Sequence, residues 1–165
     1  QIYSTKYDSL YKLQKTQNIP FSDSTVVRDT MRLWFQKADS AFTKVTELDS
    51  TYYGGFLWKG RMQSRLDPES ETNIGKVAYE KALAILEKGD REKNRKLMIE
   101  CYKYLAFNSF LNYERLNKTD KEQAEELKKA TMDYFLKILQ LDPADKQANE
   151  AVDALKKVDA SKKGK

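Results

Sequence analysis

The residue types that most often carry out acid–base and nucleophilic chemistry are nearly absent from this chain. It contains no histidine and one cysteine, Cys101. The lack of histidine removes the commonest general base and the commonest metal ligand together. Cys101 lies in the run MIECYKYLAF, where a lone cysteine is more often a small buried hydrophobic residue than a nucleophile. The sequence therefore offers no Ser–His or Cys–His pair and no disulfide within the chain.

Other segments that resemble sites of chemistry are better explained as turns or solvated surface. Glu125 and Glu126 adjoin on a charged helical stretch, which indicates a solvated face. The glycines of YYGGF follow a helix rather than a strand, which indicates a turn, and DPADKQ has too few ligands for a calcium loop. We predict a protein with no catalytic residues, metal or cofactor. An enzyme that uses carboxylates or Cys101 is the minor alternative, and it would require an activity that is removed by Cys101→Ala or by loss of one acidic residue.

The charge pattern argues against nucleic acid and membranes as partners. The net charge is only +5, and much of the excess comes from lysines in the last ten residues, KKVDASKKGK. Acidic and basic residues interleave elsewhere, whereas a nucleic-acid surface needs a basic face. No apolar run reaches the length of a membrane span. The chain begins with QIYSTKY and has no initiator methionine, so we interpret it as a processed product or a fragment of a longer protein. The lack of a signal peptide therefore says little about its compartment.

The elements that would position any site are helices. A third of the residues are charged and only six are glycine and three proline, which favours helices over sheets. Apolar residues recur at helical spacing, and no segment alternates like a strand. Ser24 is a candidate N-cap and Gly89 a candidate helix stop. We expect helices at about 3–16, 24–48, 52–66, 72–88, 92–116, 120–141 and 145–158.

A short phrase recurs at the ends of three of these helices. Each copy has a lysine, then an apolar residue, then a second apolar residue three positions further on. The copies lie 37 and 56 residues apart, so the period is irregular. They are Lys44-Val45 with Leu48, Lys81-Ala82 with Ile85, and Lys137-Ile138 with Leu141.

The recurring helix pairs resemble the tetratricopeptide repeat (TPR) family. The motif positions in the middle repeat are Phe56, Gly60, Tyr79 and Ala82; in the third they are Tyr102, Leu105, Ala106, Phe135, Ile138 and Pro143. The first repeat matches at Ala38, Phe42 and Val45, with Tyr7, Leu10 and Tyr11 as the candidates in its first helix. The resemblance implies an all-α, right-handed superhelix of about three antiparallel helix pairs with a C-terminal capping helix.

The resemblance also suggests how the chain is divided. We expect one TPR-like domain over residues 1–158, with repeats at about 3–50, 51–89 and 92–143 and a cap at 145–158. Ala148, Ala151, Val152 and Leu155 would cover the last open face, and one hydrophobic seam would continue through the stack. Gly60 and Ala106 would allow close approach of paired helices. The basic tail, 159–165, is expected to be disordered.

Family members bind partners along first helices, and the matching positions here carry a mixture of side chains. They are Gly54, Leu57, Arg61, Ser64 and Arg65 in the second repeat, and Glu100, Lys103, Phe107, Phe110 and Leu111 in the third. Arg61, Arg65 and Lys103 suit a carboxylate or an acidic peptide, and the two phenylalanines suit an apolar anchor. The competing interpretation places Phe107 and Phe110 in the core, where aromatic residues at helical spacing usually lie.

Taken with the resemblance, these features predict a non-catalytic scaffold that binds a peptide or helix of a partner protein in the concave groove of the stack. The candidate contact residues are Leu57, Arg61, Ser64, Arg65, Lys103, Phe107 and Phe110. The alternative is a structural or oligomerising segment of a larger cell-envelope assembly, including a homo-oligomer. Analogy with divergent bacterial TPR modules suggests a periplasmic or cell-envelope location.

Overall fold

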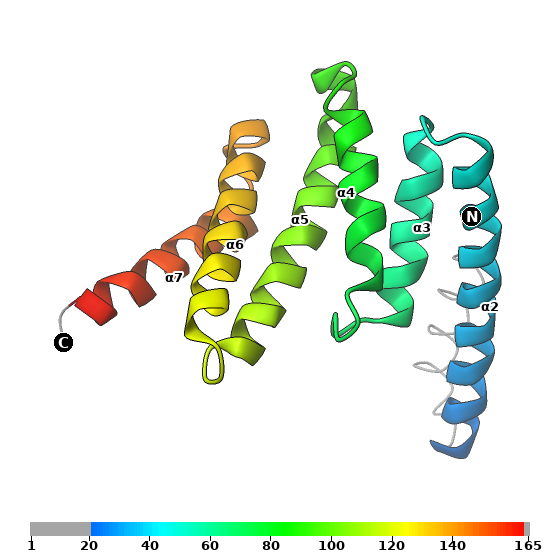
Figure 1. Ribbon diagram of the computed structural model, residues 1–165, viewed down its shortest axis with the longest axis horizontal. Coiled ribbons are helices and arrows are strands. Elements are labelled where there is room, and N and C mark those ends of the chain that lie inside the picture. Colours follow the sequence, from blue (N-terminus) through cyan, green and yellow to red (C-terminus); the bar gives the residue numbers. More distant parts are fainter. Residues whose placement is uncertain (1–20, 164–165) are drawn as a thin grey trace.

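The part of the chain that the structure describes is helical. The computed structural model describes the backbone of residues 21–163 and the side chains of residues 28–157. The helices are α2 (Phe21–Leu48), α3 (Tyr53–Leu66), α4 (Ile74–Leu86), α5 (Arg91–Leu116), α6 (Lys121–Leu141) and α7 (Lys146–Lys163). They follow one another in a row, with α2 at one end and α7 at the other (Figure 1). The all-α class is confirmed for this range.

The helices predicted within this range all occur, with most bounds within three residues. Two differences are at the ends. Helix α2 begins at Phe21, so Ser24 lies inside its first turn and is not the N-cap. Helix α7 continues to Lys163, so residues 159–163 of the predicted disordered tail are helical. The predicted helix at 3–16, with its motif positions Tyr7, Leu10 and Tyr11, lies outside the described residues.

Aspartate side chains fix the starts of the last three helices. The Asp90 carboxylate accepts hydrogen bonds from the backbone N–H groups of Glu92 and Lys93, at 3.1 and 3.2 Å. Asp120 and Asp145 accept equivalent bonds from N–H groups three residues further on, at 3.0 and 2.9 Å. These bonds satisfy amides that have no partner within the helix, and the negative charge is favourable at a helix N-terminus.

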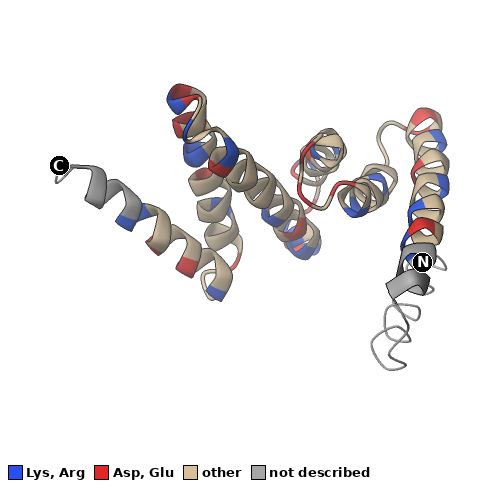
Figure 2. Cartoon of the chain, turned by 90° about the horizontal axis from the view of Figure 1, so that it is seen from below, with Lys and Arg blue, Asp and Glu red and all other residues tan. Residues whose placement is uncertain are grey.

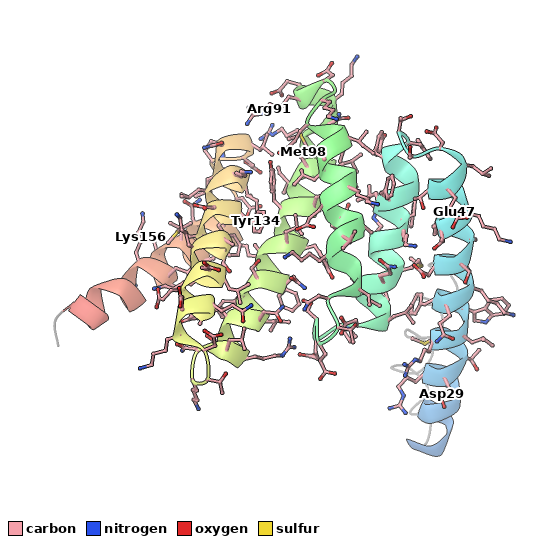
Figure 3. The ribbon with its side chains drawn as sticks, viewed as in Figure 1. Asp29, Glu47, Arg91, Met98, Tyr134 and Lys156 are labelled. Carbon is pink, nitrogen blue, oxygen red and sulfur yellow. The ribbon has the colours of Figure 1, made fainter. Side chains whose placement is uncertain are left out.

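The helices pack mainly against their neighbours in sequence. The most extensive contacts join α3 to α4 and α5 to α6, which are the pairs expected from the sequence. Met98 of α5 and Tyr134 of α6 lie along the second of these seams (Figure 3). The main core runs from α3 to α7 through Phe56, Leu57, Tyr79, Ala82, Leu83, Leu86, Met98, Cys101, Tyr102, Leu105, Ile138, Leu141 and Ala148.

A second, smaller core joins α2 to α3. Its buried members are Phe35, Ala38 and Met62. The expectation of one continuous hydrophobic seam is therefore wrong for the described helices. Between the two cores lies a cleft that is lined by Arg61 and Glu100 together with residues of both cores, Phe35, Met62 and Tyr79.

The repeated lysine phrase has a structural counterpart in both complete pairs. The Lys81 Nζ of α4 lies 5.4 Å from the ring centroid of Phe56 on α3. The Lys137 Nζ of α6 lies 5.3 Å from that of Tyr102 on α5. In each pair the next residue, Ala82 or Ile138, is fully buried. The same cation–π contact thus recurs at equivalent positions, which supports the assignment of two repeats.

Gly60 allows the close approach of α3 and α4. A Cβ atom added there would lie 2.8 Å from the ring of Tyr79, and that ring is itself stacked on Tyr104 with centroids 4.1 Å apart. The ring is therefore held on both sides. Gly89, by contrast, lies beyond the end of α4 without a positive φ, so it does not stop the helix by a left-handed conformation.

The loop between α3 and α4 is held by one buried carboxylate. Asp67 accepts hydrogen bonds from the backbone N–H groups of Glu71 and Thr72, at 2.8 and 3.0 Å, and from the Thr72 hydroxyl at 2.9 Å. Burial opposes ionisation of Asp67, but these bonds outweigh it and hold its pKa below the ordinary value. Arg115 of α5 reaches across to donate to the Ser70 carbonyl at 2.8 Å.

We expect Gly60→Ala to destabilise the chain although alanine is the better helix former. Overpacking against a fixed ring costs about 1–3 kcal/mol, while the propensity gain is at most about 1 kcal/mol. The matched control is Gly54→Ala, where the nearest atoms to the new methyl, all closer than 3.0 Å, belong to the far end of Tyr52, a half-exposed side chain that can move away. Thermal unfolding is followed by circular dichroism. The midpoint temperature of unfolding should be lower than that of the wild-type chain for Gly60→Ala and unchanged for Gly54→Ala. Equal midpoints for the two variants would contradict this packing account.

We also expect Asp67→Asn to destabilise the chain at neutral pH by about 1–3 kcal/mol, because buried N–H groups lose their charged acceptor. Since the folded-state pKa of Asp67 is lowered, the wild-type advantage is complete above the ordinary pKa of 3.8 and is lost as the pH falls through the folded value. Urea unfolding at neutral and acidic pH measures the difference in free energy of unfolding between the wild-type chain and Asp67→Asn, and Asp153→Asn at an exposed position is the control. If this difference does not decrease in acid, Asp67 is not the charged acceptor that holds the loop.

Candidate functional site

Helix α5 has one strip of apolar side chains that its neighbours leave uncovered. Its buried strip includes Cys101 and Leu105, which belong to the main core, and the fully buried Ala106. Phe107 and Phe110 are 48% and 39% exposed. Their interpretation as core residues is therefore wrong. They are uncovered because α7 crosses α6 obliquely and does not close over α5 (Figure 1).

The exposed strip forms one wall of an apolar groove of about 460 Å³. Lys103, Phe107, Phe110 and Glu114 line it from α5. Phe135 of α6 contributes to the lining between the two walls. The α7 wall consists mainly of small or aliphatic side chains: Ala151, Ala154 and Leu155. A volume of this size can take a few apolar side chains of a partner or one small ligand.

An internal ion pair holds one end of this groove. The Lys103 Nζ lies 2.6 Å from an Asp145 carboxylate oxygen, and the Asp145 side chain is only 10% exposed. Burial opposes ionisation of Asp145, but the hydrogen bonds from Lys103 and from the Ala148 amide lower its pKa below the ordinary value. Asp145 thus joins α7 to α5 and caps α7 at once. Lys103 is already paired, which weakens its predicted role as a carboxylate ligand.

The second candidate site is the polar cleft between the two cores, of about 370 Å³. The Arg61 guanidinium donates two hydrogen bonds to the Glu100 carboxylate, both 2.6 Å long, and lies 4.4 Å from the centroid of Trp58. The hydrogen bonds with Glu100 raise the pKa of Arg61. Like Lys103, Arg61 is occupied by an internal carboxylate, so neither cation is available without breaking a pair.

The remaining predicted contact residues are divided between core and surface. Leu57 is 3% exposed and belongs to the main core, so it is not placed to contact a partner. Ser64 and Arg65 line the polar cleft, and the Ser64 hydroxyl donates to the Arg61 carbonyl at 2.9 Å. The structure therefore separates the predicted set into a polar cleft along α3 and an apolar groove along α5 and α7.

Cys101 is unsuited to nucleophilic chemistry. It is fully buried in the main core. Burial raises the pKa of its thiol to about 12, so the thiolate is scarce at neutral pH. Among the described residues there is also no group of three or more side chains with the types and arrangement of a metal site.

Sequence reasoning missed the groove residues outside the family motif. Asp145 was overlooked because it lies in the turn after Pro143, although an aspartate just before a helical run is a recognisable N-cap signal. Glu114 lies four positions after Phe110 and so shares its strip of α5, which the spacing alone could have indicated. Ala151 was assigned to the buried face of the cap, but it also lines the groove.

The described surface has no large region of one charge. Blue and red positions alternate along most helices (Figure 2). None of the helices described is both long and apolar enough to span a membrane. The groove of α5 and α7 is therefore distinguished by its exposed aromatic side chains and not by its charge.

Comparison with a known structure supports the assignment of the fold. The fold resembles the crystal structure of the C-terminal part of a TPR repeat-containing protein from Cytophaga hutchinsonii, with a TM-score of 0.54 and 26% sequence identity. The match covers 92% of this chain and 57% of that structure, so the chain spans little more than half of its length. No family model and no curated protein sequence matches the chain. The fold is a divergent TPR-like array of helix pairs.

We expect Glu100→Gln to destabilise the chain by about 1 kcal/mol, since Arg61 loses a bidentate charged partner that is only partly screened by solvent. The matched control is Glu126→Gln, an exposed residue of α6, which should change stability little. Urea unfolding at low and high salt measures both variants, and the effect of Glu100→Gln should decrease with salt. Equal stability of the two variants would show that the pair contributes nothing measurable.

Proposed function

We propose that the chain is a non-catalytic interaction scaffold that binds a peptide or helix of a partner protein in the groove between α5 and α7. One observation carries the proposal: Phe107 and Phe110 remain about half exposed and line the groove between α5 and α7. Exposed aromatic side chains gathered in such a feature are typical of recognition surfaces.

The surroundings of the two phenylalanines favour this groove over the polar cleft. The aromatic side chains are on a helix fixed in the core, and the opposite wall is tied to it by the Lys103–Asp145 pair. A groove with fixed walls loses little conformational entropy when a ligand binds. In the polar cleft, a ligand carboxylate would have to displace Glu100 from Arg61, so binding there would be opposed by the loss of that pair.

The TPR-like fold supports the same general role, because stacked helix pairs commonly present such surfaces to other proteins. The alternative, a structural or oligomerising segment of a larger cell-envelope assembly, predicts that the groove contacts another copy or another part of that assembly. Self-association measured by sedimentation distinguishes these two functions, since a peptide scaffold should remain monomeric when no ligand is present.

We expect Phe107→Ala and Phe110→Ala each to weaken peptide binding by about tenfold or more, as truncation of an aromatic anchor usually does. Stability should change little, because both side chains are half exposed. Peptides selected from a displayed random library against the wild-type chain provide the ligands, and titration calorimetry measures their affinity. Leu136→Ala on α6, which exchanges another exposed apolar residue, is the matched control. Selected peptides that bind all variants equally would contradict the proposal.

A further inference from the structure

We infer that the occupant of the groove is an amphipathic helix that carries a basic residue one turn beyond its apolar anchor. This inference rests on the proposed function and specifies the chemistry of its ligand. Three features of the groove carry it: the spacing of its aromatic wall, the small residues opposite, and the position of its one uncompensated charge.

The spacing of the walls matches a helix. Phe107 and Phe110 are three positions apart on α5, and Ala151 and Ala154 are three positions apart on α7. Side chains at this spacing lie about 5–6 Å apart on one helical face. A ligand helix presents its own side chains at the same interval. Bulky side chains of the ligand helix can enter the groove, because the small alanine side chains of α7 leave space opposite the phenylalanine rings of α5.

The charges of the groove are asymmetric. The charged side chains that line it are Lys103 and Glu114. Lys103 is neutralised by Asp145 at 2.6 Å. Glu114 is exposed, and no ion pair joins it to any of the described residues. The groove is therefore close to neutral at the Lys103 end and negative at the Glu114 end.

The position of Glu114 sets the register of the ligand charge. Glu114 follows Phe110 by four residues, about 6 Å along the axis of α5. A lysine or arginine one helical turn beyond the side chain that contacts Phe110 can therefore reach this carboxylate. An acidic residue at the same place would be repelled. The expected ligand thus differs from the acidic peptide suggested by Arg61, Arg65 and Lys103 in the sequence.

The test uses two side-chain-stapled model helices labelled with fluorescein. Both carry leucine at positions i, i+3, i+4 and i+7, and they differ only in a lysine or a glutamate one turn beyond the last leucine. Binding is followed by fluorescence anisotropy. The lysine peptide should bind the wild-type chain about threefold to fivefold more tightly, as expected for one exposed ion pair. Glu114→Lys should reverse the order, and Glu114→Gln should remove the preference.

The outcomes separate the inference from the proposed function. If both peptides bind equally, or if Glu114→Lys leaves their order unchanged, the charge assignment is wrong while the groove remains a binding site. If neither model helix binds while peptides selected against the wild-type chain still do, the groove does not hold such a helix and only the inference fails. If Phe110→Ala leaves the binding of model helices and selected peptides unchanged, both proposals fail. If sedimentation instead shows a dimer that Phe110→Ala dissociates, the occupant is a second copy of this chain and the inference is overturned.

Discussion

The close packing of α5 between α4 and α6 is the constraint on which the rest of the structure depends. Cys101, Leu105 and Ala106 on its buried strip are almost completely removed from solvent. Gly60 allows the close approach of α3 and α4, which holds α4 in place beside α5, and Ala106 of α5 is fully buried. Because α5 is fixed by two neighbours, the direction of its remaining strip is fixed as well. The orientation of Phe107 and Phe110 therefore follows from core packing and not from local flexibility.

The same packing explains why the cations identified in the sequence are less available than expected. Helices held close together bring oppositely charged residues from different helices into contact, as for Arg61 with Glu100 and Lys103 with Asp145. Both cations were expected from the sequence to contact a ligand. In this chain they stabilise the arrangement of α3, α5 and α7 instead. The strip of α5 that remains uncovered carries the aromatic side chains of Phe107 and Phe110, with the acidic Glu114 at its edge.

Most of the described fold could be predicted from the sequence, because helical spacing, Gly60 and the recurring lysine phrase are local signals. The Lys81–Phe56 and Lys137–Tyr102 contacts show that the phrase marks equivalent places in two helix pairs. The site was less predictable. Whether Phe107 faces the core or solvent depends on the crossing of α7 over α6, and side-chain spacing within one helix does not encode that crossing. The partners of Arg61 and Lys103 lie on distant segments, so only the folded arrangement reveals them.

Chemical-shift mapping by NMR is the most direct test that α5 and α7 together form the recognition surface. The amide and methyl signals of the labelled chain are followed while the lysine-bearing model helix is added. The account predicts that the shifts concentrate around Phe107–Glu114 on α5 and around Gln147–Leu155 on α7. Shifts centred on the Arg61 cleft, or on the outer faces of α4 and α6, would contradict it.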